Sequence, residues 1–222
     1  MNEVIGDLLP LALGVAISPV PIIAVILMLL APRARAASVA FLGGWLVGIA
    51  VVVTVVALVV DPASGDEDGP ATWVSWTKLA LGVVAVVLAV GQWRGRPRPG
   101  DEPHLPGWMA AIDSVTPARA AGLGALLSAL NPKNLTLCLA GGVAIGGGGL
   151  DGAGTTVAVV VFTLLGGCSV GVPVISYLVA ADRLRGPLDE LRAWLTVHNA
   201  AVMSVLLLVI GVSLVGKGVG GL

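Results

Sequence analysis

Long apolar runs separated by short polar segments dominate the chain. The runs cover residues 8–30, 38–60, 74–92, 120–145, 154–180 and 195–217. Each is long enough for a helix to cross the hydrocarbon core of a bilayer, which needs about 20 residues. Residues 51–60 do not alternate between apolar and polar, as a strand of a membrane barrel would. The pattern therefore predicts an all-α membrane protein with six transmembrane helices, because lipid requires that the backbone satisfy its own hydrogen bonds.

The composition agrees with this pattern and leaves no room for a soluble domain. Of the 222 residues, 57% are hydrophobic and only 11% are charged, against about 25% charged in ordinary soluble domains. Six spans and short loops fill this length, so we expect one transmembrane domain, residues 1–222. A net charge of -1 without a basic face argues against a nucleic-acid partner.

Motifs that carry catalysis or bind cofactors are missing from the sequence. It has no paired carboxylates in a span, no His-rich metal spacing, no Gly-x-Ser-x-Gly and no Walker loop. Cys138 and Cys168 lie in apolar stretches without metal or redox spacing, so we interpret both as packing residues. We expect no enzyme activity, no metal, no cofactor and no ATP hydrolysis by this chain.

The charges in the loops predict an orientation. Nine of the twelve basic residues fall in alternate loops: Arg33, Arg35, Arg94, Arg96, Arg98, Arg119, Arg183, Arg185 and Arg192. The intervening loops carry acids: Asp61, Asp66, Glu67, Asp68 and Asp151. Since short positive loops stay in the cytoplasm, we expect both termini outside a bacterial inner membrane.

The charges near the predicted outer surface are interpreted as interfacial or solvated, and the loop at 93–118 has two possible structures. Lys78 and Lys217 lie near outer ends of spans, where they can snorkel, and Asp7 is most simply a solvated charge at a helix start. The loop at 93–118 contains residues 108–113, which are either an interfacial helix or a plain linker.

The chain contains an internal repeat. Residues 43–48 (Gly-Gly-Trp-Leu-Val-Gly) match residues 166–171 (Gly-Gly-Cys-Ser-Val-Gly), and both lie in the second span of their half. Three spans per half is an odd number, so the halves should be inverted in the membrane. We predict repeats at 1–92 and 119–222, joined by the cytoplasmic loop 93–118. The spacing of small residues also makes a homodimer conceivable.

Proline motifs occupy corresponding places in spans one and four, at Ser18-Pro19-Val20-Pro21 and Asn131-Pro132-Lys133. Proline lacks the N–H that a helix needs, so both spans should be broken near their middle. Broken backbone in a membrane is tolerated only against protein or a water-filled cavity. The two breaks therefore predict a shared central site, where the positive N-terminal ends of half-helices favour an anionic group.

Lys133 is the strongest candidate for function, because a cation inside a span is costly. Either it lines a cavity, or span four starts late and the side chain snorkels to the interface. The asparagines and Ser18 either cap half-helices or coordinate a solute. His198 and Asn199 either form part of a proton path or are helix-bonded or interfacial. The predicted substrate-binding residues are Ser18, Pro19, Pro21, Asn131, Pro132, Lys133 and Asn134.

Several segments together resemble a known family. They are residues 17–26 (Ile-Ser-Pro-Val-Pro-Ile-Ile-Ala-Val-Ile), 32–35 (Pro-Arg-Ala-Arg), 41–45 (Phe-Leu-Gly-Gly-Trp), Trp108-Met109, Asp113, Thr116-Pro117, Ala120, Gly124 and 126–135 (Leu-Leu-Ser-Ala-Leu-Asn-Pro-Lys-Asn-Leu). Over nearly its whole length the chain resembles the actinobacterial GAP family, the glycopeptidolipid- and sulfolipid-addressing proteins.

This resemblance implies membership of the lysine-exporter (LysE) superfamily, with its six-helix inverted-repeat fold and its role in export. It also implies that relatives help move glycolipids to the mycobacterial cell surface, alongside larger lipid exporters. The leading hypothesis is a secondary transporter or flippase-like protein for an anionic, lipid-linked or glycolipid substrate. The alternatives are an exporter of a small solute, such as an amino acid or a cation, and a non-transporting accessory subunit of a larger lipid exporter.

Overall fold

The computed structural model describes residues 2–31, 34–60, 72–96, 112 and 115–222. Apart from one short helical turn at Ile112, the secondary structure in these residues consists of α-helices, which confirms the all-α prediction for this part of the chain. The helices are α1 Asn2–Ala16, α2 Pro19–Leu30, α3 Ala34–Val59, α4 Thr72–Arg94, α5 Pro117–Ala129, α6 Pro132–Gly146 and α7 Gly152–Gly220.

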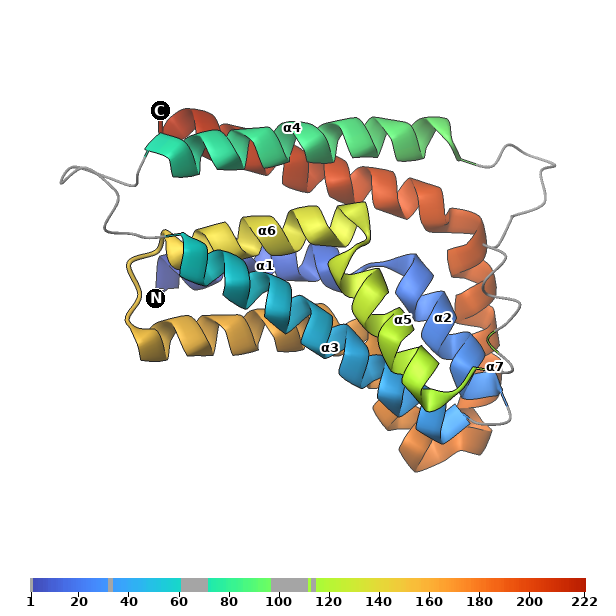
Figure 1. Cartoon of the computed structure of the whole chain (residues 1–222). Helices are drawn as coiled ribbons and strands as arrows, with labels where there is room; N and C mark the ends of the chain where they lie inside the picture. The colour runs from blue at the N-terminus through green and yellow to red at the C-terminus, as the bar shows by residue number, and fades with distance from the viewer. Residues whose placement is uncertain (1, 32–33, 61–71, 97–111, 113–114) are drawn as a thin grey trace.

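Both proline motifs interrupt helices, as predicted. In the first half α1 ends at Ala16 and α2 starts at Pro19, and the two helices are bent by 51° relative to each other. In the second half α5 ends at Ala129 and α6 starts at Pro132, and the two meet at an angle (Figure 1). Proline is tolerated at the first position of a helix, where its missing N–H would have no partner.

The prediction of six membrane spans is confirmed only in part among the described residues. Four helices are long and apolar enough to cross a membrane: Ala34–Val59, Thr72–Arg94, Gly152–Ala181 and Arg183–Gly220. The bent pair formed by α1 and α2 makes a fifth candidate. α5 and α6 have only 13 and 15 residues, and they are not among these candidates. The described residues therefore establish a multi-pass membrane protein with four to five candidate spans.

Helix α7 contains two of these spans. Its 69 residues are interrupted at Ala180, whose φ of -142° and ψ of 52° are not helical. After this point α7 crosses the end of the bundle opposite the termini and then returns alongside α4 (Figure 1). The returning helix has 38 residues, or about 57 Å at 1.5 Å per residue. That length exceeds the roughly 30 Å hydrocarbon core, so the helix also covers the end of the bundle.

The helices pack closely at the glycines of the repeat. α3 lies against α5, where a Cβ atom at Gly44 would be 1.9 Å from the Ala121 carbonyl oxygen. In the second copy a Cβ atom at Gly167 would be 2.3 Å from Leu46 of α3. The buried Trp45 side chain donates from Nε1 to the Gly166 carbonyl at 3.3 Å. The first glycine motif therefore lets the backbones of α3 and α5 approach closely, which a larger residue would prevent, whereas the second motif meets the Leu46 side chain of α3.

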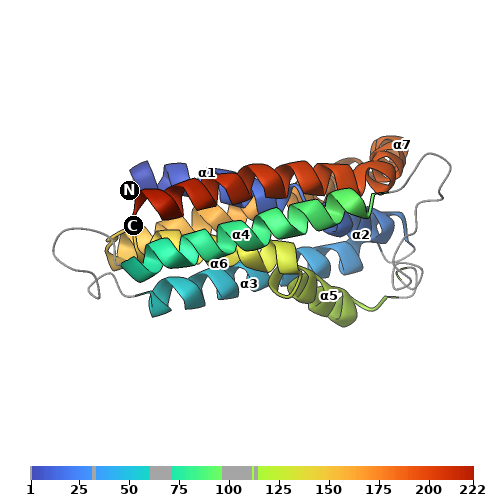
Figure 2. The same ribbon diagram turned by 90° about the horizontal axis from the view of Figure 1, so that it is seen from above.

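The arrangement also places the ends of the chain. Both termini lie at the same end of the bundle (Figure 1), and α4 lies beside the returning part of α7 when the molecule is viewed from above (Figure 2). The helix or linker predicted at 108–113 falls almost entirely outside the described residues, as do the acidic loop at 61–68 and Arg33 and Arg98.

Candidate functional site

The break between α1 and α2 leaves backbone carbonyls without their usual partners. In a continuous helix the nitrogen of residue 21 would donate to the carbonyl of Ile17, four positions earlier. Residue 21 is a proline, so it has no hydrogen to donate. The N–H of Ser18 donates to the Ala16 carbonyl at 2.8 Å, and not to the carbonyl four residues back. The C-terminal end of α1 therefore presents acceptors to its surroundings.

Lys133 meets one of these acceptors from the other break. Its Nζ atom donates to the Ile17 carbonyl oxygen at 3.1 Å, and the residue is only 5% exposed. The carbonyl end of a helix carries partial negative charge, which favours a cation there. Ser169 adds a second contact, donating from Oγ to the Ala16 carbonyl at 2.5 Å. Side chains from α6 and α7 thus cap the end of α1.

The break between α5 and α6 has its own capping side chains. Asn131 is the N-cap of α6, and its Oδ1 atom accepts from the backbone N–H of Lys133 at 3.1 Å. Asn134 is fully buried and donates from Nδ2 to the Leu127 carbonyl at 3.1 Å. Asn134 Oδ1 is buried and lacks a hydrogen-bond partner within the described residues. An unpaired buried acceptor is costly, so this oxygen is available to a ligand or a water molecule.

The structure thus brings the two predicted proline motifs together through one hydrogen bond. Ser18 is 2% exposed and is the N-cap of α2, but its side chain makes no capping hydrogen bond. Lys133 points into the protein, since its head group contacts backbone rather than solvent. That these residues bind substrate stays a prediction.

His198 and Asn199 lie on the later part of α7. The His198 ring stacks on Trp194 with centroids 4.6 Å apart, and Nδ1 lies 2.9 Å from the Trp194 carbonyl. His198 is exposed, while Asn199 has a buried Oδ1 atom without a partner among the described residues. The described hydrogen bond of His198 is within its own helix and does not reach the breaks. The proton path is still a prediction.

Sequence reasoning missed two polar contacts, one at the break between α1 and α2 and one near the termini. Ser169 lies inside the second glycine motif, where a polar residue among apolar ones was a visible signal. Asp7 was expected to be merely solvated, but its carboxylate pairs with Lys217 near the end of α7. Opposite charges near the starts and ends of helices were visible in the sequence. Which of them meet depends on how the helices pack.

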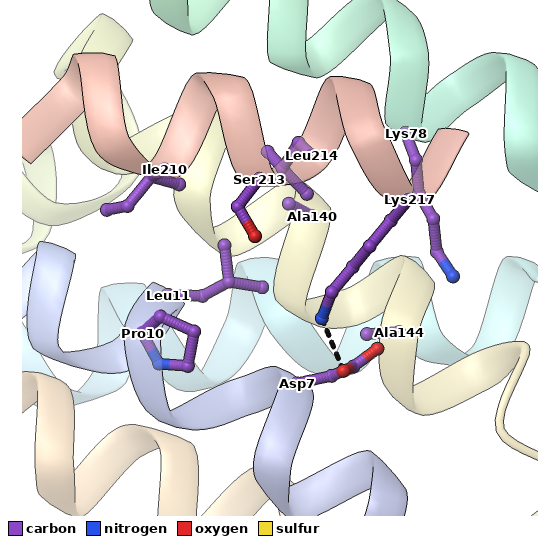
Figure 3. A pocket seen from close by; sticks show the side chains of 10 residues that line it. All are labelled: Asp7, Pro10, Leu11, Lys78, Ala140, Ala144, Ile210, Ser213, Leu214 and Lys217. Atoms are coloured by element: carbon purple, nitrogen blue, oxygen red, sulfur yellow. Dashed lines mark hydrogen bonds and ion pairs between the residues drawn. The ribbon is translucent and has the colours of Figure 1, made fainter. Parts of the chain in front are cut away.

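The Asp7–Lys217 pair lies at a small pocket near the termini (Figure 3). The pocket has a volume of about 20 Å³, enough for roughly one water molecule. Its lining residues come from α1, α4, α6 and α7: Asp7, Pro10, Leu11, Lys78, Ala140, Ala144, Ile210, Ser213, Leu214 and Lys217. The ion pair therefore borders a space that holds about one water molecule.

A much larger pocket lies where α2 ends, α3 begins and α7 changes direction. Its volume is about 600 Å³. A third pocket, of about 380 Å³, lies between α4 and α7 beside Trp93, Arg94 and Ser204. Lys133 does not line any of these three pockets. The buried contact between the breaks is thus separate from the described openings.

Comparison with known proteins agrees with the resemblance seen in the sequence. No curated protein and no solved structure matches the chain. The family model described as "Sap, sulfolipid-1-addressing protein" matches residues 8–220. This match covers both breaks, both glycine motifs and every helix from α2 to α7. The chain therefore belongs to the sulfolipid-1-addressing protein family, as a lipid-related multi-pass membrane protein.

Proposed function

We propose that this protein is a secondary transporter or flippase-like exporter, which moves an anionic lipid-linked or glycolipid substrate outward across the inner membrane. The observation that carries the proposal is the buried hydrogen bond between Lys133 and the Ile17 carbonyl. It joins two helix breaks through a single cation. Family membership supports the lipid-related character of the substrate.

The chemistry of this contact suits an exchangeable anion site. A buried ammonium is strongly destabilised unless it is well paired, and here the described acceptor is one neutral carbonyl. An anionic group would be a stronger partner for Lys133 than this carbonyl. The helices α2 and α6 both start at the breaks, so their positive ends add to the attraction. Binding of an anion would then release the end of α1 from Lys133.

The packing supports an inverted repeat of the kind found in the LysE superfamily. α3 packs along α5 and α6, and α7 packs along α1 and α2, which are the positions that a two-fold relation between the halves requires. In this proposal the α5–α6 pair is the sixth crossing, shortened by its break. The large pocket then faces the cytoplasm and the Asp7–Lys217 pair faces outward, with both termini outside.

The test is a lipid-localisation assay in cells that lack the native protein and express variants at equal levels. Lys133→Met should reduce the surface-exposed lipid about tenfold or more, because loss of a charged hydrogen bond is worth about 1.5–3 kcal/mol. Lys78→Met is the matched control, since it removes a lysine on α4, a helix that carries neither break. Normal lipid localisation in a folded Lys133→Met variant would refute the proposal.

A non-transporting accessory role is the second candidate. The same hydrogen bond is compatible with it, because the bond can serve only to hold the two broken helices together. If Lys133 only holds two broken helices together, a variant that keeps the fold should keep function. Stable co-purification with a larger exporter, together with a folded and active Lys133→Met variant, would select this candidate. Export of a small solute is the remaining alternative, and a lipid-independent transport activity in vesicles would select it.

A further inference from the structure

The 600 Å³ pocket is lined by residues from three helices and the turn between α2 and α3. They are Leu30, Ala31, Ala34, Arg35, Ala36, Tyr177, Ala181 and Arg185. Most of these side chains are small and apolar, but two are arginines from segments far apart in the sequence. The segments that line it, the end of α2, the start of α3 and the bend of α7, lie at the end of the bundle away from the termini (Figure 1).

Local backbone geometry creates the space. α2 ends at Leu30 and the chain becomes extended at Ala31, with φ -78° and ψ 161°. On the opposite side α7 loses helical geometry at Ala180, so the helix direction changes beside Ala181. Alanine side chains at the wall leave this space unfilled, and neither of the two changes in direction involves a glycine.

Arg35 and Arg185 make this space electropositive. Both side chains are exposed, and neither has an ion pair among the described residues. The described residues that line the pocket include no carboxylate. A guanidinium group presents a planar set of donors that matches the oxygens of a phosphate or sulfate ester. Two such groups beside an apolar wall suit a ligand with an anionic head and an apolar body.

The positive-inside rule explains why arginines occur at this end, but it does not explain why two of them share one pocket. Arg183 shows the difference. It lies two positions before Arg185 and is also exposed, yet it does not line the pocket. The convergence of Arg35 and Arg185 therefore comes from the packing of α3 against the bend in α7.

We infer that Arg35 and Arg185 bind the anionic headgroup of a membrane lipid, through a phosphate or sulfate ester, in the pocket between the α2–α3 turn and the bend of α7. This inference deepens the proposed function. It rests on that function in one respect: during export the headgroup would bind at this pocket before it binds at Lys133. The binding itself does not require export.

The experiment measures binding to the full-length protein in nanodiscs of phosphatidylcholine. One probe is dihexanoyl phosphatidic acid and the other is inorganic phosphate, each titrated by calorimetry. The wild type should bind the short-chain lipid more tightly than the free anion, since only the lipid uses the apolar wall. The double variant Arg35→Gln/Arg185→Gln should weaken lipid binding about tenfold or more, and Arg183→Gln should leave it unchanged within about twofold.

Thermal unfolding of each variant checks that the fold is kept, and each single variant should show an intermediate loss. Unchanged lipid affinity in the double variant, or an equal loss in Arg183→Gln, would overturn the inference. Equal affinity for phosphate and lipid would overturn the headgroup assignment. Lys133→Met should keep the component of probe binding that the double variant loses, so loss of export and loss of headgroup binding at this pocket are separable. If Lys133→Met exports normally, the proposed function fails while this binding site stands.

Discussion

The two helix breaks look alike in sequence but play opposite chemical roles. The break at Ser18-Pro19 leaves carbonyls at the end of α1 without their usual helical donors, and its Ser18 side chain makes no capping bond. The break at Asn131-Pro132 carries the donors, because Lys133 and Asn134 both bind freed carbonyls. One break therefore completes the hydrogen bonding of the other. Two similar proline motifs can therefore be complementary in their hydrogen bonding.

The largest expected effect comes from removing the donor that joins the breaks. Lys133→Met should lower the free energy of unfolding by about 1–3 kcal/mol, because the Ile17 carbonyl is left buried without a donor, a cost that exceeds the gain from no longer burying a charge. Thermal or denaturant unfolding in detergent measures this change. If the variant is as stable as the wild type, the lysine does not cap α1.

The next largest effect comes from the two prolines at the break, which leave the Ile17 carbonyl without a hydrogen-bond donor from its own helix. Pro19→Ala/Pro21→Ala restores two backbone donors and allows a continuous helix, so the Ile17 carbonyl gains an intrahelical partner. In this background Lys133→Met should be less destabilising by about 1 kcal/mol or more. A double-mutant cycle gives this coupling. Additive effects would mean that the prolines and Lys133 act independently.

The difference between the two N-cap residues, Asn131 and Ser18, should give a smaller change in stability. Asn131→Ala removes a capping bond to the N–H of Lys133 and should reduce stability by about 1 kcal/mol. Ser18→Ala removes no such bond and should change stability by only a few tenths of a kcal/mol. Unfolding of the two variants under the same conditions tests this difference. Equal losses would show that the two breaks are capped alike.

The smallest expected effect lies at the end of the bundle that holds both termini. Asp7→Asn removes the ion pair with Lys217, whose partners are each more than a third exposed. Such pairs contribute about 0.2–1 kcal/mol, and salt screens them. The loss should therefore be visible at low salt and shrink at high salt. A larger, salt-independent loss would show that Asp7 has a buried role that the pair does not explain.

The sequence alone determined the features that follow from local chemistry. Run lengths identified apolar spans, and proline's missing N–H located both breaks to within two residues. A lysine within an apolar run marked Lys133 as exceptional. The family resemblance was also readable, because the Asn-Pro-Lys-Asn segment is an unusual combination. The span count was less secure, since a break leaves two short helices that lack the length of a spanning helix.

Only the tertiary structure decided which distant groups meet. The sequence shows that the Ile17 carbonyl loses its donor, but the replacement lies 116 positions away, at Lys133. Asp7 and Lys217 are 210 positions apart, and Arg35 and Arg185 share a pocket only because α7 bends at Ala180. The physical reason is that chemistry along the chain creates unsatisfied groups locally, whereas helix packing determines which partners can reach them.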